Sequence, residues 1–132
     1  MTIRRLAALA AAGASLAGVA ACSASAHTAP PPGATGSTCG TTRTGANVPV
    51  VIKVTKGTVS CAAVMRVESG YAALIKNGRL PGNGGGAPVK VSGWTCQGYP
   101  TPQVLRTGNA SECHTASAEV VAVVELPSSS GS

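Results

Sequence analysis

The sequence contains no aspartate and no phenylalanine, and both absences restrict what this 132-residue chain can do. Its four carboxylate side chains are Glu68, Glu112, Glu119 and Glu125. Metal sites and phosphoryl-transfer sites built on aspartate are therefore excluded. Since Tyr71, Trp94 and Tyr99 are the only aromatic residues, the core has to be built from valine, alanine, leucine and isoleucine.

Histidine is scarce too, because His114 is the only one outside the proline-rich segment that contains His27. A histidine-based triad would need His114, a nucleophile and a group that orients the imidazole ring. Glu112 and Cys113 precede it, but Cys113 is better used in a disulfide, and a strand end or turn explains the tripeptide. The motifs G-x-S-x-G and H-E-x-x-H do not occur. We therefore expect no enzyme activity, no metal site and no cofactor.

The start of the chain has the features of an export signal. Arg4 and Arg5 precede an apolar stretch over residues 6–19, which is too short and too rich in alanine to span a bilayer. The stretch ends in "VAAC", which is typical of a bacterial lipobox. Residues 1–21 are thus predicted to be a lipoprotein signal peptide, with Cys22 as the lipidation site. The alternative is an ordinary signal peptide cut near "ASA", which would leave no anchor.

The number of cysteines supports lipidation. Five are present, so attachment of lipid to Cys22 leaves an even set of four. An even set in a small exported domain indicates disulfides. Of the three possible pairings we favour Cys39 with Cys61 and Cys96 with Cys113, and the other two stay open.

Composition also divides the chain. Residues 22–38 are rich in proline, alanine, serine and threonine, which predicts a flexible linker. The folded domain is expected over residues 39–126, followed by a disordered tail over 127–132. Without the signal, eight basic and four acidic residues leave a net charge of +4, which suits anionic lipid headgroups. Nucleic acid is a poor partner because the basic residues are scattered and no aromatic platform accompanies them.

Hydrophobic periodicity predicts one helix and several strands in the domain. Residues 60–78 have helical spacing, with Ser60 as the N-cap and Gly78 just after the last turn. Alternation and β-branched residues predict strands over residues 47–57, 89–99, 103–107, 111–115 and 119–126. This order predicts an α+β domain in which one helix packs on a small antiparallel sheet (β-α-β-β-β) with two disulfides.

The glycine-rich segment over residues 79–88 lacks the Lys-Ser/Thr pair of a phosphate-binding loop and follows a helix, so we interpret it as a connector.

The strings "TVSCAAVMRVESGY", "VSGWTC" and "SECHT", followed by a valine-rich strand, resemble a largely uncharacterised family of small exported or lipid-anchored actinobacterial proteins, including mycobacterial ones. The match covers residues 59–124, and its most specific parts are Ser60-Cys61, Gly93-Trp94-x-Cys96 and Cys113. The resemblance implies an envelope location and a helix-on-sheet fold, and it implies no known reaction. The upstream Cys39 departs from the commoner pattern.

Trp94 has two interpretations. It can pack on a disulfide and complete the core, with its N–H finding a partner. It can instead form an exposed platform for a sugar or an acyl chain, with Tyr99 and the "GNGGG" segment as a rim. Trp94 and Tyr99 are therefore the candidate ligand contacts.

Together these features predict a lipid-anchored, non-enzymatic protein on the outer face of the cytoplasmic membrane. Its partners are expected to be the membrane, through the anchor, and an envelope protein or glycolipid. One alternative is a lipid or glycolipid carrier, which needs a cavity of at least about 300 Å³. Another is an exported protease inhibitor, for which residues 97–108 are the candidate exposed loop.

Overall fold

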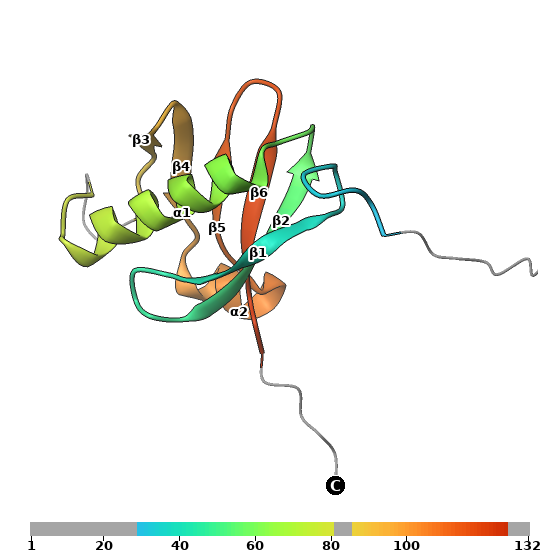
Figure 1. Cartoon of the computed structure of the whole chain (residues 1–132). Helices are drawn as coiled ribbons and strands as arrows, with labels where there is room; N and C mark the ends of the chain where they lie inside the picture. The colour runs from blue at the N-terminus through green and yellow to red at the C-terminus, as the bar shows by residue number, and fades with distance from the viewer. Residues whose placement is uncertain (1–28, 81–85, 127–132) are drawn as a thin grey trace, which may run out of the picture.

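The computed structural model describes residues 29–80 and 86–126, in which six antiparallel strands and two helices form an α+β domain (Figure 1). The strands lie in the order β1-β2-β6-β5-β4-β3. The elements in chain order are β1 (Thr38–Arg43), β2 (Pro49–Lys56), α1 (Cys61–Lys76), β3 (Val89–Val91), β4 (Trp94–Gly98), α2 (Thr101–Thr107), β5 (Asn109–His114) and β6 (Glu119–Val124). The predicted α+β class is confirmed. The strand β1 and the helix α2 were not predicted, and the residues of β3 and β4 were predicted as one strand.

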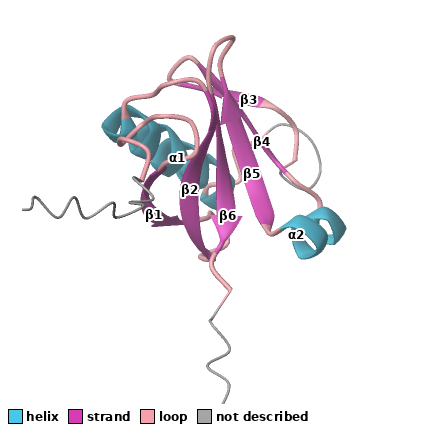
Figure 2. Cartoon of the chain, turned by 90° about the vertical axis from the view of Figure 1, so that its right-hand side faces the viewer, coloured by secondary structure: helices cyan, strands magenta, loops and turns pink. Residues whose placement is uncertain are grey.

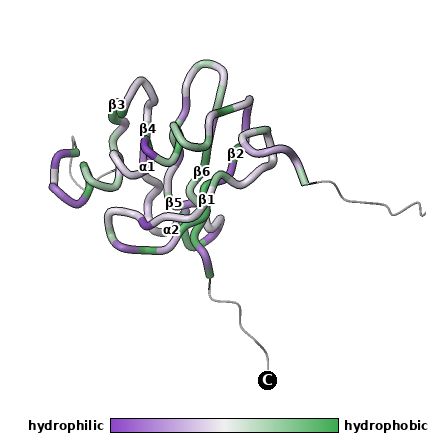
Figure 3. The backbone as a smooth tube through the Cα atoms, in the orientation of Figure 1, coloured by the Kyte–Doolittle hydropathy of each residue, from purple (hydrophilic) through white to green (hydrophobic). Residues whose placement is uncertain are grey.

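The core lies between α1 and one face of the sheet (Figure 2). Side chains alternate along each strand, so every second residue of β2 and β6 points toward the helix. Hydrophobic residues gather along β6 near the middle of the sheet (Figure 3), as expected for a buried central strand. The largest fully buried side chains are Val50, Ile52, Val54, Val64, Val120, Cys96 and Cys113.

The ends of α1 follow the capping rules that the sequence indicated. The Ser60 side chain accepts a hydrogen bond from the Ala63 backbone N–H at 3.3 Å. At the other end Gly78 adopts a left-handed φ of 64° and donates to the Ile75 carbonyl at 3.1 Å. Glycine adopts this conformation without a Cβ clash, so both predicted helix boundaries are confirmed.

The single strand predicted over residues 89–99 is wrong, because these residues form the β3–β4 hairpin. Val91 pairs with Trp94, so the turn contains only Ser92 and Gly93. Both have positive φ, 48° and 84°, as in the type I′ turns that favour tight hairpins.

The strand predicted over residues 103–107 is wrong too, because these residues belong to α2. Pro100 is its N-cap and Pro102 lies in its first turn, where a missing N–H is tolerated. Gly108 ends the helix with a left-handed φ of 76°. Local proline and glycine positions therefore outweighed the weak alternation in this stretch.

Both disulfides form with the pairing that we favoured. Cys96 and Cys113 lie directly opposite each other on β4 and β5, with their Cα atoms 4.0 Å apart. Cys39 and Cys61 join β1 to the first residue of α1. Each bridge therefore fixes a contact between segments that are distant in sequence.

The packed part of the chain starts before Cys39, so the predicted end of the linker at residue 38 is wrong. Gly33 and Ser37 are buried, and the Val59 N–H donates to the Gly33 carbonyl at 2.8 Å. A Cβ on Gly33 would lie 2.1 Å from the Val59 carbonyl oxygen, so only glycine fits there.

Several predictions concern residues outside the described ranges: the signal peptide over 1–21, the lipidation site Cys22, His27 and the tail over 127–132. Most of the "GNGGG" segment lies outside them as well. Within residues 29–80 and 86–126, no helix has the length and apolar character to cross a bilayer.

Candidate functional site

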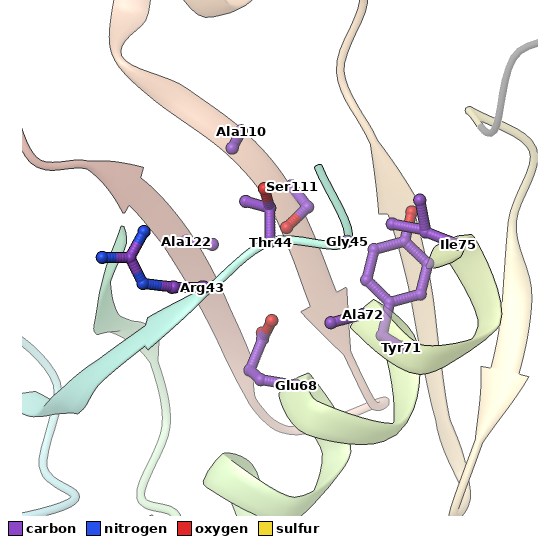
Figure 4. Close-up of a pocket in the computed structure, with 10 residues that line it drawn as sticks. All are labelled: Arg43, Thr44, Gly45, Glu68, Tyr71, Ala72, Ile75, Ala110, Ser111 and Ala122. Carbon is purple, nitrogen blue, oxygen red and sulfur yellow. The ribbon is translucent and has the colours of Figure 1, made fainter. Parts of the chain in front are cut away.

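A small cavity of about 60 Å³, here called the Glu68 cavity, lies between α1 and the sheet near the end of β1 (Figure 4). Its lining combines polar and apolar side chains. Figure 4 shows the Glu68 side chain extending from the helix toward Thr44 and Ser111. The polar side chains that line the cavity belong to Arg43, Thr44, Glu68, Tyr71 and Ser111.

Glu68 is the most unusual residue of this cavity. Only 4 % of its surface is exposed, and its Oε1 atom has no hydrogen-bond partner among the described residues. Burial removes water from the carboxylate and raises the pKa of Glu68 to about 7. The residue therefore changes charge near neutral pH, where an exposed glutamate is fully ionised.

Tyr71 lies one helical turn after Glu68 and is also buried, with 2 % of its surface exposed. Its hydroxyl has no hydrogen-bond partner in the described part of the chain. Burial and the neighbouring Glu68 charge raise the pKa of Tyr71 to about 12. The hydroxyl therefore keeps its proton at neutral pH and can both donate and accept a hydrogen bond.

Arg43 contributes the positive charge of the cavity lining, but it does not neutralise Glu68. Its Nη1 atom donates to the Asn47 carbonyl at 2.9 Å. In Figure 4 the guanidinium group points away from the Glu68 carboxyl group. No ion pair joins the two residues, and only desolvation shifts the Glu68 pKa.

A larger apolar groove of about 330 Å³ adjoins this cavity. It lies between the β1–β2 loop, the last turn of α1 and α2. Its apolar walls come from Ala46, Val48, Ile75, Val104, Ala110 and Val124. The groove and the Glu68 cavity lie next to each other, because they share four lining residues: Thr44, Gly45, Ile75 and Ala110.

Gly45 sets the boundary between the two spaces. A Cβ at this position would lie 2.5 Å from the Ile75 side chain and 2.9 Å from the Ala72 carbonyl oxygen. Glycine therefore lets the β1–β2 loop pack directly on the last turn of α1.

The two candidate ligand contacts do not share a site. Trp94 begins β4 and packs, half-buried, against the core cluster. Tyr99 follows the other end of β4 and lines the groove. Trp94 therefore packs against the core at the start of β4, and Tyr99 lies at a cavity near its other end.

Tyr99 also belongs to a polar cluster centred on Glu112. The Tyr99 hydroxyl and the Gln97 amide both donate to the Glu112 carboxylate, and His114 Nδ1 lies 3.6 Å from Glu112 Oε1. Burial is the main cause of a raised pKa of Tyr99, and the hydrogen bond from its hydroxyl to Glu112 raises that pKa further. Cys113 is held in a disulfide, so this cluster has no thiol nucleophile beside His114.

The segment over residues 97–108, expected as an exposed loop, is mostly ordered into the end of β4 and α2. Residues 101–107 are helical, so they do not offer the extended backbone that pairs with a strand of a partner protein.

Glu68 is not among the site residues predicted above, although the sequence carries a signal for it. Glu68 is four residues after Val64 and three before Tyr71, so it lies on the apolar face of the predicted helix. A carboxylate on that face is unusual, because glutamate is rarely buried without a partner. The groove had no such signal, because it combines residues from five separate segments.

Comparison with protein-family models, curated proteins and solved structures finds no match to this chain.

Proposed function

We propose that the protein is an exported, lipid-anchored binding module of the cell envelope, without enzymatic activity. The observation that carries this proposal is the apolar groove of about 330 Å³ beside α2. Small-molecule sites are typically concave and mostly apolar, with a few polar groups that orient the ligand. The groove and the adjoining Glu68 cavity have this composition.

The two disulfides support a location outside the cytoplasm, because such bonds persist in oxidising compartments. The lipobox over residues 19–22 supports attachment through a lipid. Two acyl chains give stable membrane binding where one gives only reversible binding. In this proposal the chain between Cys22 and Gly33 acts as the tether that holds the domain at the membrane surface.

The anchor can be tested by replacing its thiol. Cells that express the protein are grown with an alkyne fatty acid, and we expect label on the wild type and none on Cys22→Ala. The reason is that only the cysteine sulfur can form the thioether to diacylglycerol. A matched Ser23→Ala variant should stay labelled. Unlabelled wild-type protein, or label that persists on Cys22→Ala, would contradict the anchor.

The groove can be tested with an apolar fluorescent probe, 1-N-phenylnaphthylamine. Val104 lines the groove, whereas the next residue, Leu105, is 81 % exposed. We expect the probe to bind the wild type and Leu105→Asp equally. Val104→Asp should bind it at least about tenfold more weakly, because ligand binding would desolvate the new charge.

Circular dichroism of both variants controls for folding. Absence of probe binding to the wild type, or equal losses in the two variants, would refute the groove as a binding site.

A further inference from the structure

We propose that the Glu68 cavity receives the cationic head of an amphiphilic amine, whose apolar body lies in the adjoining groove. This inference rests on the proposed binding function and names the ligand class. A suitable ligand is a primary ammonium group on an aliphatic chain.

The hydrogen-bonding groups of the cavity match a primary ammonium group. Apart from Arg43, its polar side chains present only oxygen atoms, from Thr44, Glu68, Tyr71 and Ser111. Two of these residues, Glu68 and Tyr71, are more than nine-tenths buried, and each has an oxygen without a partner in the described structure. A primary ammonium carries three donors and no acceptor, so it matches this set better than a carboxylate or phosphate does.

The charges around the cavity also favour a cationic head. α1 brings Glu68 and Tyr71 to the cavity, and the end of β1 brings Arg43. The parts of β5 and β6 that line it, Ala110, Ser111 and Ala122, carry no titratable side chain. Arg43 is hydrogen-bonded to the Asn47 carbonyl, and among the described residues no cation forms an ion pair with Glu68. A ligand cation supplies a counter-charge, and an opposite charge nearby favours the ionised carboxylate.

The sizes of the two spaces fit a small head and a longer body. The Glu68 cavity of about 60 Å³ has room for a head group of a few heavy atoms. The groove of about 330 Å³ has room for about ten water-sized groups, since one water occupies ~30 Å³ in the liquid. The apolar side chains of Val48, Ile75 and Val104 favour an alkyl body over a polar one.

The test compares n-octylamine, n-octanol and octanoate as competitors of 1-N-phenylnaphthylamine at pH 6 and pH 8. We expect octylamine to bind about tenfold more tightly at pH 8, because the ionised fraction of a carboxyl with a pKa of about 7 rises about tenfold over this range. Octanol should bind equally at both pH values.

Glu68→Gln keeps the shape of the side chain and removes its charge. It should therefore abolish both the pH dependence of octylamine binding and the preference for octylamine over octanol. Glu125→Gln, at an exposed position, should change neither.

Equal binding of octylamine and octanol to the wild type at pH 8 would overturn the inference, and so would stronger binding of octanoate. Either result leaves the groove itself as a binding site, because the probe still binds. Failure of the probe to bind the wild type would instead refute the proposed function.

Discussion

Reduction of both disulfides is expected to lower the free energy of unfolding by about 6 kcal/mol and to leave the domain largely unfolded at about 37 °C. The bridges span sequence separations of 22 and 17 residues, and each loop of this length contributes about 3 kcal/mol. The two loops do not overlap, so their effects on the unfolded chain should add. A loss of this size matches the entire stability of many small domains.

The two bridges should contribute unequally. Cys96 and Cys113 are fully buried, whereas Cys39 and Cys61 are half-buried. Replacing the Cys96–Cys113 pair by alanine also leaves unfilled space in the core, which adds to the loss. Replacing the Cys39–Cys61 pair mainly releases β1 from the start of α1.

Urea unfolding followed by circular dichroism, with and without a phosphine reductant, measures the total effect. The two double alanine variants, Cys39→Ala/Cys61→Ala and Cys96→Ala/Cys113→Ala, separate the contributions. A reduced wild-type protein with an unchanged unfolding midpoint would contradict the prediction. Greater loss in the Cys39→Ala/Cys61→Ala protein would contradict the assigned order.

The parts of the fold that could be predicted have strong local signals. α1 has both a 3.6-residue apolar period and capping residues at its ends, Ser60 and Gly78. β6 is rich in valine, which indicated a buried strand, and it lies in the interior of the sheet between β2 and β5. The favoured disulfide pairing succeeded because it joined predicted neighbouring strands and the predicted helix start.

The missed elements have conflicting or short signals. The apolar positions change phase across Ser92 and Gly93, from the odd-numbered Val89 and Val91 to the even-numbered Trp94 and Cys96. The runs on either side have only three and five residues, so this one-residue shift is a short signal for a hairpin. α2 has only seven residues, with boundaries marked by Pro100 and Gly108 instead of an apolar face. β1 is mostly threonine and glycine, and its pairing with β2 depends on a contact that no local pattern shows.

The site was less predictable than the fold, because its chemistry comes from packing. Glu68 has an ordinary pKa in an exposed helix, and only the sheet over it removes the water from its carboxyl group. The β1–β2 loop, which closes the cavity through Gly45, follows a strand that was not predicted. A buried carboxylate without an ion-pair partner destabilises the fold, so the position of Glu68 favours a functional purpose over a structural one.

The same burial predicts how stability depends on pH. Desolvation raises the Glu68 pKa from 4.5 to about 7 in the folded state, so between these pH values the folded protein keeps a proton that the unfolded chain loses. Its stability therefore falls as pH rises through this window, and the loss stays constant above about pH 7. A rise in the Glu68 pKa from 4.5 to about 7 corresponds to about 3 kcal/mol.

Glu68→Gln has no carboxyl group at position 68 to ionise. Its free energy of unfolding minus that of the wild type should therefore be about 3 kcal/mol larger at pH 8 than at pH 4. Other titrating groups affect both proteins alike, so the difference between their urea unfolding curves isolates Glu68. The exposed Glu125→Gln variant should follow the wild type at every pH. A constant difference between Glu68→Gln and the wild type from pH 4 to pH 8 would mean that Glu68 ionises freely in the fold. The cavity would then be open to water, and the carboxylate would need no cation.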